Sequence, residues 1–326
     1  MRAPILLSIL TIWLSCPSYS ASPRMPLLDS HGRITVGRVP LDESDPRRRQ
    51  VGALTFLGGI SLSSGDPAFG GFSSMTVSGD RFTLLNDGGN VVRFRMDTAF
   101  GLSSVVFGNL ANGPGRGWDK GDRDSESMTT DGAGHVWVGF EGFNQIWRYS
   151  PGITGPGKGV APPAMRKWPE NLGAESLVRL HDGRFLTIGE YAHPRHHKEL
   201  RVALVFSGDP ITRPDTGFAF SYRPPAGYDP SDATELPDGR IIVLNRDFKP
   251  PFNWSAVLTL IDPRAIRQGA VISGREIARF AAPLTVDNYE ALAVTRENGA
   301  TILWMASDDN QSILERSLLL KFRLNL

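Results

Sequence analysis

Short runs in which apolar and polar residues alternate recur along most of the chain, separated by turns rich in glycine and aspartate. Five segments share one pattern and begin at Ser73, Glu126, Glu175, Asp232 and Glu290. In each segment an alternating run leads into a turn and then into β-branched and aromatic residues, as in ESLVRLHDGRFLTIGEY. This pattern is typical of two antiparallel strands joined by a tight turn. The sequence therefore predicts five copies of one hairpin.

The spacing of these hairpins predicts the architecture. Their starts lie 49 to 58 residues apart, close to the roughly 40–50 residues of a four-stranded propeller blade with room for loop insertions. We expect an all-β propeller of five blades, or six if residues 31–72 or the long loops hold a degenerate blade. The final run SLLLKFRL, from Ser317, has no partner in its own hairpin. An N-terminal strand from residues 32–39 or 53–60 is expected to pair with it and close the ring.

The first residues differ in character from the rest of the chain. Residues 1–20 combine one basic residue, an apolar run and small residues, which predicts a signal peptide; the run is too short to span a bilayer. Cys16 also permits a lipoprotein anchor, an alternative ranked second because Trp13 stands where a lipobox takes a small aliphatic residue. We expect an exported protein, periplasmic or extracellular. Residues 21–50 are interpreted as a polar approach segment and residues 51–326 as the propeller domain.

Composition limits the chemistry that the chain can use. The 35 basic and 34 acidic residues nearly balance, which argues against nucleic acid or a membrane surface as a bulk electrostatic partner. Cys16 is the one cysteine, so the mature chain is expected to use no disulfide, thiolate nucleophile or cysteine-bound zinc. The 35 glycines and 24 prolines suit the many turns of one all-β domain. We expect a monomer that binds a small anionic substrate or an envelope ligand.

Acidic residues stand at equivalent places in the repeats. The pairs are Glu126 with Glu141 and Glu175 with Glu190, both 15 residues apart, Ser73 with Asp87, and Glu290 with Asp308. The fourth copy runs from Asp232 to Asp247, but its turn glycine, Gly239, comes one residue early, so its register is open by one position. Because equivalent positions of radial blades converge, these carboxylates are expected to crowd the axial channel.

Converging carboxylates suggest two roles. They can bind a divalent cation or activate a water molecule, and Glu126, Glu175 and Glu290 are the candidates to orient that water. They can instead cap backbone N–H groups, a role favoured for any single acid. The set as a whole favours a site, because burying many like charges is costly without a cation.

Two polar segments flank the expected channel. In the loop GPGRGWDKGDRDSE, Asp122 and Asp124 alternate with Glu126, as oxygen ligands do in calcium loops, although a solvated loop with internal ion pairs fits equally well. After Glu190 comes a basic insertion whose Arg195, His196 and Lys198 are candidates for binding phosphate oxygens at the channel mouth. A solvated cluster is the alternative there.

These repeats resemble the phytase-like family, described as having esterase-like activity of phytase, over roughly residues 50–326. The segments that carry the resemblance are ESM with VWVGFEGFNQIWRY, AESLVRLHDGRFLTIGEY, ATELPDGRIIVLNRDF, and YEALAVT with LWMASDDN and LLLKFRL. The motif acids implied by the resemblance are Asp87, Glu126, Glu141, Glu175, Glu190, Glu290, Asp308 and Asp309. Where the family often shows an Asp-Glu pair, this chain has Phe140-Glu141.

The resemblance implies an exported hydrolase of phosphoric esters. A divalent cation, with calcium expected first, would be held by channel acids, and the predicted metal set is Asp87, Asp122, Asp124, Glu141, Glu190, Asp308 and Asp309. The alternative is a non-catalytic propeller that binds a ligand or another protein of the cell envelope. Propellers host both roles, so the fold does not decide between them.

Overall fold

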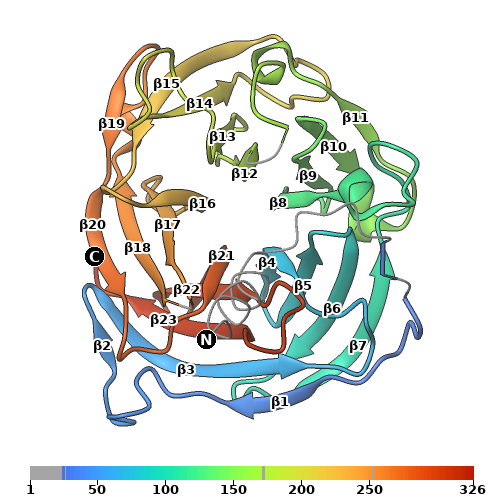
Figure 1. Cartoon of the computed structure of the whole chain (residues 1–326), viewed down its shortest axis with the longest axis vertical. Helices are drawn as coiled ribbons and strands as arrows, with labels where there is room; N and C mark the ends of the chain where they lie inside the picture. The colour runs from blue at the N-terminus through green and yellow to red at the C-terminus, as the bar shows by residue number, and fades with distance from the viewer. Residues whose placement is uncertain (1–23, 26, 171–172, 252) are drawn as a thin grey trace, which may run out of the picture.

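The alternating runs form a ring of antiparallel sheets in the computed structural model, seen down its axis in Figure 1. The structure describes residues 24–25, 27–170, 173–251 and 253–326. The predicted signal peptide and the possible anchor at Cys16 lie outside these residues. In the part of the chain that is described, no helix has the length and apolar character needed to cross a bilayer.

Five sheets surround the axis, which confirms the predicted all-β propeller and sets the number of blades at five. The first blade is β4 (Phe72–Ser78), β5 (Arg81–Asn86), β6 (Asn90–Met96) and β7 (Leu102–Asn109). The second is β8 (Ser125–Thr130), β9 (Val136–Phe140), β10 (Gln145–Tyr149) and β11 (Lys158–Val160). The third is β12 (Ala174–Arg179), β13 (Phe185–Gly189), β14 (Arg201–Phe206) and β15 (Gly217–Arg223), to which β19 (Val271–Ser273) adds in parallel. The fourth is β16 (Asp229–Glu235), β17 (Ile241–Lys249), β18 (Asn253–Ile261) and β20 (Arg275–Phe280).

The fifth blade joins the two ends of the chain, as predicted. Its strands from the C-terminal part are β21 (Asn288–Glu297), β22 (Ala300–Asp308) and β23 (Ser317–Leu324), and those from the N-terminal part are β3 (Leu54–Ser63), β1 (Thr35–Arg38) and β2 (Gln50–Val51). β23 pairs directly with β3, with Leu319 opposite Ile60. β1 then adds outside β3. Both N-terminal stretches named from the sequence therefore take part in closing the ring.

Apolar side chains between neighbouring blades hold the ring together. The ring of Phe82 on β5 packs edge-on against Trp304 on β22, with centroids 4.8 Å apart. Phe280 on β20 packs in the same way against Phe322 on β23, at 5.6 Å. All four side chains are buried. Because these contacts join separate sheets, they fix the angle between blades and so the positions of residues around the axis.

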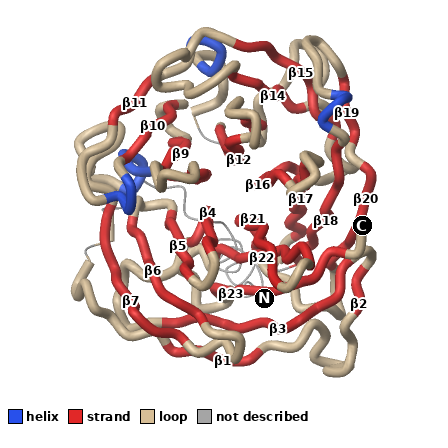
Figure 2. Tube along the Cα trace, turned by 180° about the vertical axis from the view of Figure 1, so that it is seen from behind, coloured by secondary structure: helices blue, strands red, loops and turns tan. Residues whose placement is uncertain are grey.

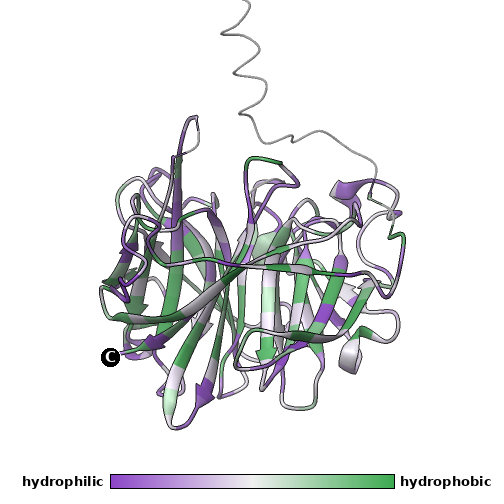
Figure 3. Cartoon of the chain, turned by 90° about the horizontal axis from the view of Figure 1, so that it is seen from below, coloured by the Kyte–Doolittle hydropathy of each residue, from purple (hydrophilic) through white to green (hydrophobic). Residues whose placement is uncertain are grey.

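The innermost strands all start at the same face of the ring. Since strands within each blade are antiparallel, the start of the first strand and the end of the second lie at that face, here called the mouth face. Its loops join second to third strands and outermost strands to the next blade. Figure 3 shows the two faces from the side. Figure 2, from the opposite side to Figure 1, shows the 3-10 segments, including η1 (Lys120–Arg123), η2 (Pro151–Ile153), η3 (Pro163–Met165) and η4 (Pro263–Ala265), confined to connections.

Candidate functional site

Each innermost strand carries a β-bulge at the same place. The bulges interrupt the pairing between Phe72 and Ser74, Ser125 and Ser127, Ala174 and Ser176, Pro230 and Asp232, and Tyr289 and Ala291. The residues skipped are therefore Ser73, Glu126, Glu175, Ser231 and Glu290. A bulge locally redirects a strand and its side chains, and bulges are frequent beside active sites. The fourth repeat thus begins at Ser231, one residue before the predicted Asp232.

A second set of equivalent positions lies on the strand that pairs with each innermost strand. Each position comes directly after the residue that pairs with the innermost strand just before its bulge. The pairs are Phe72 with Asn86, Ser125 with Phe140, Ala174 with Gly189, Pro230 with Asn245, and Tyr289 with Ser307. The next residues along the returning strands are Asp87, Glu141, Glu190, Arg246 and Asp308. Four blades therefore present a carboxylate at this position, and the fourth blade presents a guanidinium.

Serine hydroxyl groups connect the backbones of adjacent innermost strands. Ser73 donates to the carbonyl of Ser125, Ser127 donates to that of Ala174 at 2.9 Å, and Ser231 donates to that of Tyr289 at 3.1 Å. The three accepting residues directly precede Glu126, Glu175 and Glu290. A hydroxyl of one blade thus fixes the backbone from which the glutamate of the next blade projects.

The repeat acids line one cavity of about 1090 Å³ at the mouth face. Eleven carboxylates contribute to its lining: Asp87, Asp124, Glu126, Glu141, Glu175, Glu190, Glu199, Asp229, Asp247, Glu290 and Asp308. Lys120 and Arg246 lie among them. The structure therefore brings together all three predicted catalytic glutamates and five of the seven residues of the predicted metal set.

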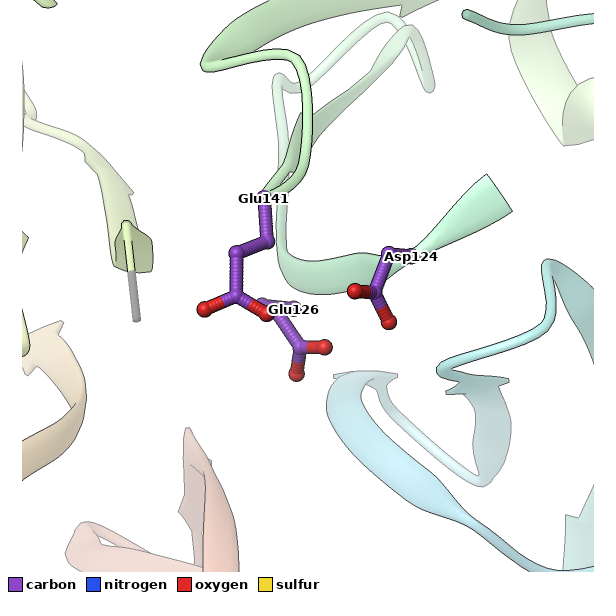
Figure 4. A group of neighbouring side chains, drawn as sticks. All are labelled: Asp124, Glu126 and Glu141. Atoms are coloured by element: carbon purple, nitrogen blue, oxygen red, sulfur yellow. The ribbon is translucent and has the colours of Figure 1, made fainter. Parts of the chain in front are cut away.

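Three of these carboxylates converge most closely. One carboxylate oxygen from each of Asp124, Glu126 and Glu141 lies within 4.8 Å of the other two. Figure 4 shows these three side chains close together. Asp124 ends the loop that contains η1, Glu126 is the bulge residue of β8, and Glu141 follows β9. Glu141 is further held because its Oε1 accepts a hydrogen bond from the backbone N–H of Gly173 at 3.0 Å. We call these three residues the acidic triad.

Arg246, on the fourth blade, bridges a carboxylate of the third blade and a carboxylate of the fifth blade. Its Nη1 donates to Glu290 Oε1 at 2.5 Å and to Asn288 Oδ1 at 2.6 Å, and its Nη2 donates to Glu190 Oε1 at 3.1 Å. Asn288 also donates to Glu290 Oε1, at 2.7 Å. Glu290 is thereby held by two donors that fix its orientation.

Lys120 supplies the second cation, from the loop before β8. It forms an ion pair with Asp87. Burial lowers the pKa of Lys120, but the nearby carboxylates, with Asp87 first and then Asp308 and Glu126, raise it by more, so this side chain stays charged. The two cations contact Asp87, Glu190 and Glu290, whereas the triad oxygens converge on one another.

Burial raises the pKa of the acids in the cavity, and repulsion between them adds to this effect. The pKa of Asp124 rises to about 6 through burial and then the charge of Asp87. The pKa of Glu141 rises to about 9 through burial, followed by Asp124 and Glu190. For Glu126 and Glu175, burial and then neighbouring carboxylates raise the pKa well above its usual value. In the absence of a cation, part of this set is therefore protonated at neutral pH.

Four of the predicted site residues lie outside the cavity lining. Asp122 accepts hydrogen bonds from the backbone N–H groups of residues 116–118, at 2.7 to 3.2 Å, and so shapes its own loop. Asp309 accepts from Gly71 N at 2.8 Å and from Ser317 Oγ at 2.7 Å. Arg195 and His196 are exposed on the loop after β13. Lys198, from the same loop, does line the cavity.

Sequence reasoning missed Arg246 as a member of the site. The spacing from the turn glycine could have identified it. In the second and third repeats this glycine lies seven residues before Glu141 and Glu190, and in the fourth repeat Gly239 lies seven residues before Arg246. The same glycine also identifies the first site position of the fourth repeat as Ser231, because Glu126, Glu175 and Ser231 each lie eight residues before their turn glycine. An aromatic wall of Tyr228, Phe248 and Trp254 was missed as well. Its residues come from loops and strand ends that have no counterpart in the other repeats.

The solved structures to which this fold is similar include those of two enzymes. Virginiamycin B lyase from Staphylococcus aureus is 11% identical, with 90% of this chain and 100% of that chain covered and a TM-score of 0.42. Glutaminyl cyclase from Myxococcus xanthus is 12% identical, with 78% and 90% covered and a TM-score of 0.43. Similarity at this level carries no argument about activity.

A search of curated proteins found no match. The model of the phytase-like family, described as esterase-like activity of phytase, matches residues 67–311. That range begins before the first bulge and ends after Asp308, so it includes every blade position that lines the cavity. The chain belongs to the phytase-like family.

Proposed function

We propose that this protein is an exported hydrolase of phosphoric esters that works with a divalent cation in the cavity at the mouth face. The observation that carries the proposal is the convergence of eleven carboxylates, five Lys and Arg side chains and an aromatic wall in one cavity of about 1090 Å³. Family membership supports the class of reaction. The cavity supports the residues that would perform it.

The donors in the acidic triad fit a hard cation. Calcium takes six to eight oxygen ligands in flexible geometry, and carboxylates are its usual protein ligands. Three carboxylates, two from residues 124–126 and one from the residue after β9, already have oxygens within 4.8 Å of one another. In addition, Glu190 Oε2 is buried with no hydrogen-bond partner among the described residues. We assign the triad as the primary ligands; Asp87, Glu190 and Asp308 line the same cavity and are the candidates for further carboxylate or water-mediated ligands.

A bound cation would supply positive charge for a phosphoryl oxygen and lower the cost of burying the acids. The chain's own residues perform the remaining work. Arg246, fixed between Glu190 and Glu290, presents a guanidinium to the cavity, a group suited to phosphate oxygens. Burial and then Glu190 and Glu141 raise the pKa of Glu175, so a nearby cation would be needed to keep it ionised, and in that form it would accept the proton of the attacking water. The hydrogen bond from Ser127 Oγ to the carbonyl of Ala174 fixes the backbone from which Glu175 projects.

Charge also limits what can enter. Eleven carboxylates against five Lys and Arg side chains leave the cavity acidic, so an anionic ester is repelled unless the cation is present. Lys198 and Arg223 line the same cavity and offset part of this repulsion. Turnover is therefore expected to depend on the cation for binding as well as for chemistry.

The direct test is an assay of the purified mature protein on phytate and on p-nitrophenyl phosphate, with calcium and with a chelator. We expect turnover with calcium and its loss with chelator. Glu175→Gln should lower kcat by about 10²–10⁴ without abolishing calcium binding, as for loss of a general base. If neither ester is hydrolysed under any condition, the protein is a non-catalytic propeller that binds a ligand.

Cation binding is tested separately by thermal unfolding. Calcium should raise the melting temperature, by about 2.7 kcal/mol of unfolding free energy at a hundredfold excess over Kd. Glu126→Gln removes one triad charge while keeping its shape, so it should abolish most of this response. Glu170→Gln changes an exposed carboxylate outside the cavity lining and serves as the control. An equal calcium response in all three proteins would show that the triad does not bind the ion.

The raised pKa values predict how stability depends on pH in the presence of chelator. An acid whose pKa is higher in the folded than in the unfolded state favours folding at low pH, and this contribution is lost as pH rises through the folded value. The window runs from the usual pKa of glutamate, near 4.5, to about 9 for Glu141. The free energy of unfolding should fall across it, as followed by urea titration at several pH values. Glu141→Gln should flatten the decline; a decline unchanged by this substitution would contradict the assignment.

A further inference from the structure

The two faces of the ring differ sharply in apolar exposure. Of the eleven large apolar side chains that are exposed among the described residues, seven lie on the mouth face. The four most exposed all belong to this group: Ile313 at 100%, Trp118 at 72%, Leu28 at 68% and Leu314 at 58%. Three others lie on outer strands, and one, Leu326, lies at the opposite face. The opposite face serves as an internal reference, since its turns expose mainly polar residues.

These side chains sit on separate loops around the mouth. Leu28 is placed there because its backbone N–H donates to Asp66 Oδ2 in the loop before β4. Trp118 is on the loop before β8, and Ile313 and Leu314 are on the loop between β22 and β23. The cavity opens among these loops. Apolar groups divided by an acidic opening do not form the continuous dry centre that a specific protein interface has.

Basic residues gather on other loops of the same face. On residues 161–170, 190–200 and the end of β17, the exposed Lys and Arg are Arg166, Lys167, Arg195, Lys198 and Lys249. The exposed acids there are Glu170 and Glu199. These loops therefore carry a local excess of positive charge beside the acidic cavity, although Lys249 is paired with Asp247 at 3.4 Å. Such an excess is attracted to an anionic lipid surface within about one Debye length.

We propose that the mouth face docks on the surface of an anionic lipid bilayer. Isolated apolar side chains at loop tips insert into the headgroup region one by one, and tryptophan is especially favourable there. The basic loops supply the electrostatic attraction. Docking in this orientation places the cavity against the lipid surface. The proposal is independent of whether the cavity hydrolyses an ester.

The test is sedimentation of the mature protein with vesicles of phosphatidylglycerol and phosphatidylcholine, compared with vesicles of phosphatidylcholine alone. We expect binding to the anionic vesicles, weakened by salt. The double variant Arg166→Gln with Lys167→Gln should weaken it by roughly tenfold or more, since each cation near the surface contributes several-fold. The double variant Ile313→Ser with Leu314→Ser should weaken it as well. Matched controls are Arg213→Gln with Arg267→Gln on the opposite face and Val271→Ser on an outer strand, which should bind as the parent does.

A second readout reports insertion and not charge alone. Brominated lipid should quench part of the tryptophan fluorescence, and Trp118→Phe should remove that quenching while the protein stays folded. The proposal is overturned if the parent does not bind anionic vesicles, or if mouth-face and control variants bind alike. It is also overturned if the mouth-face variants change the oligomeric state in sedimentation velocity without changing vesicle binding, because the face is then a protein interface.

Discussion

Repulsion among buried carboxylates is the constraint on which the rest of this structure depends. Eleven acids share one cavity, and taking even one unpaired charge out of water costs several kcal/mol. The described structure offsets the cost in two ways: Lys120 and Arg246 pair with some of the acids, and raised pKa values leave others protonated. A bound cation would offset it without protons. Protons and a cation are therefore alternative ways to neutralise the acids of this cavity.

The geometry of the site comes from repetition, and its chemistry comes from departures from repetition. Ring closure by β3 and β23, together with the bulge on each innermost strand, creates equivalent positions around the axis. If every position carried an acid, the charge would be spread evenly. Ser73, Ser231 and Arg246 break this symmetry and lower the negative charge at the first and fourth blades. The insertion that provides Asp124 adds charge at the second blade, so the acids concentrate at the triad.

The sequence was sufficient to predict the elements that repeat. Period-two alternation and turn glycines are local signals, and they gave five hairpins, the closure by Ser317–Leu324 and the convergence of Glu126, Glu175 and Glu290. The sequence could not predict features that depend on the direction in which one side chain points. Asp122 and Asp124 are two residues apart, yet one shapes its loop through backbone N–H groups and the other enters the cavity. Nor does any local pattern show that Arg246 spans two blades, because its partners are 44 and 56 residues away in the chain.

The central claim is that the acidic triad is a cation site positioned by the blade repeat. Manganese can replace calcium at oxygen ligands and scatters X-rays anomalously, so a crystal grown with manganese reports the ion's position directly. The account predicts an anomalous peak bound by oxygens of Asp124, Glu126 and Glu141, and its loss in Glu126→Gln. A saturated crystal without a peak in the cavity, or with a peak that the triad does not touch, would contradict it.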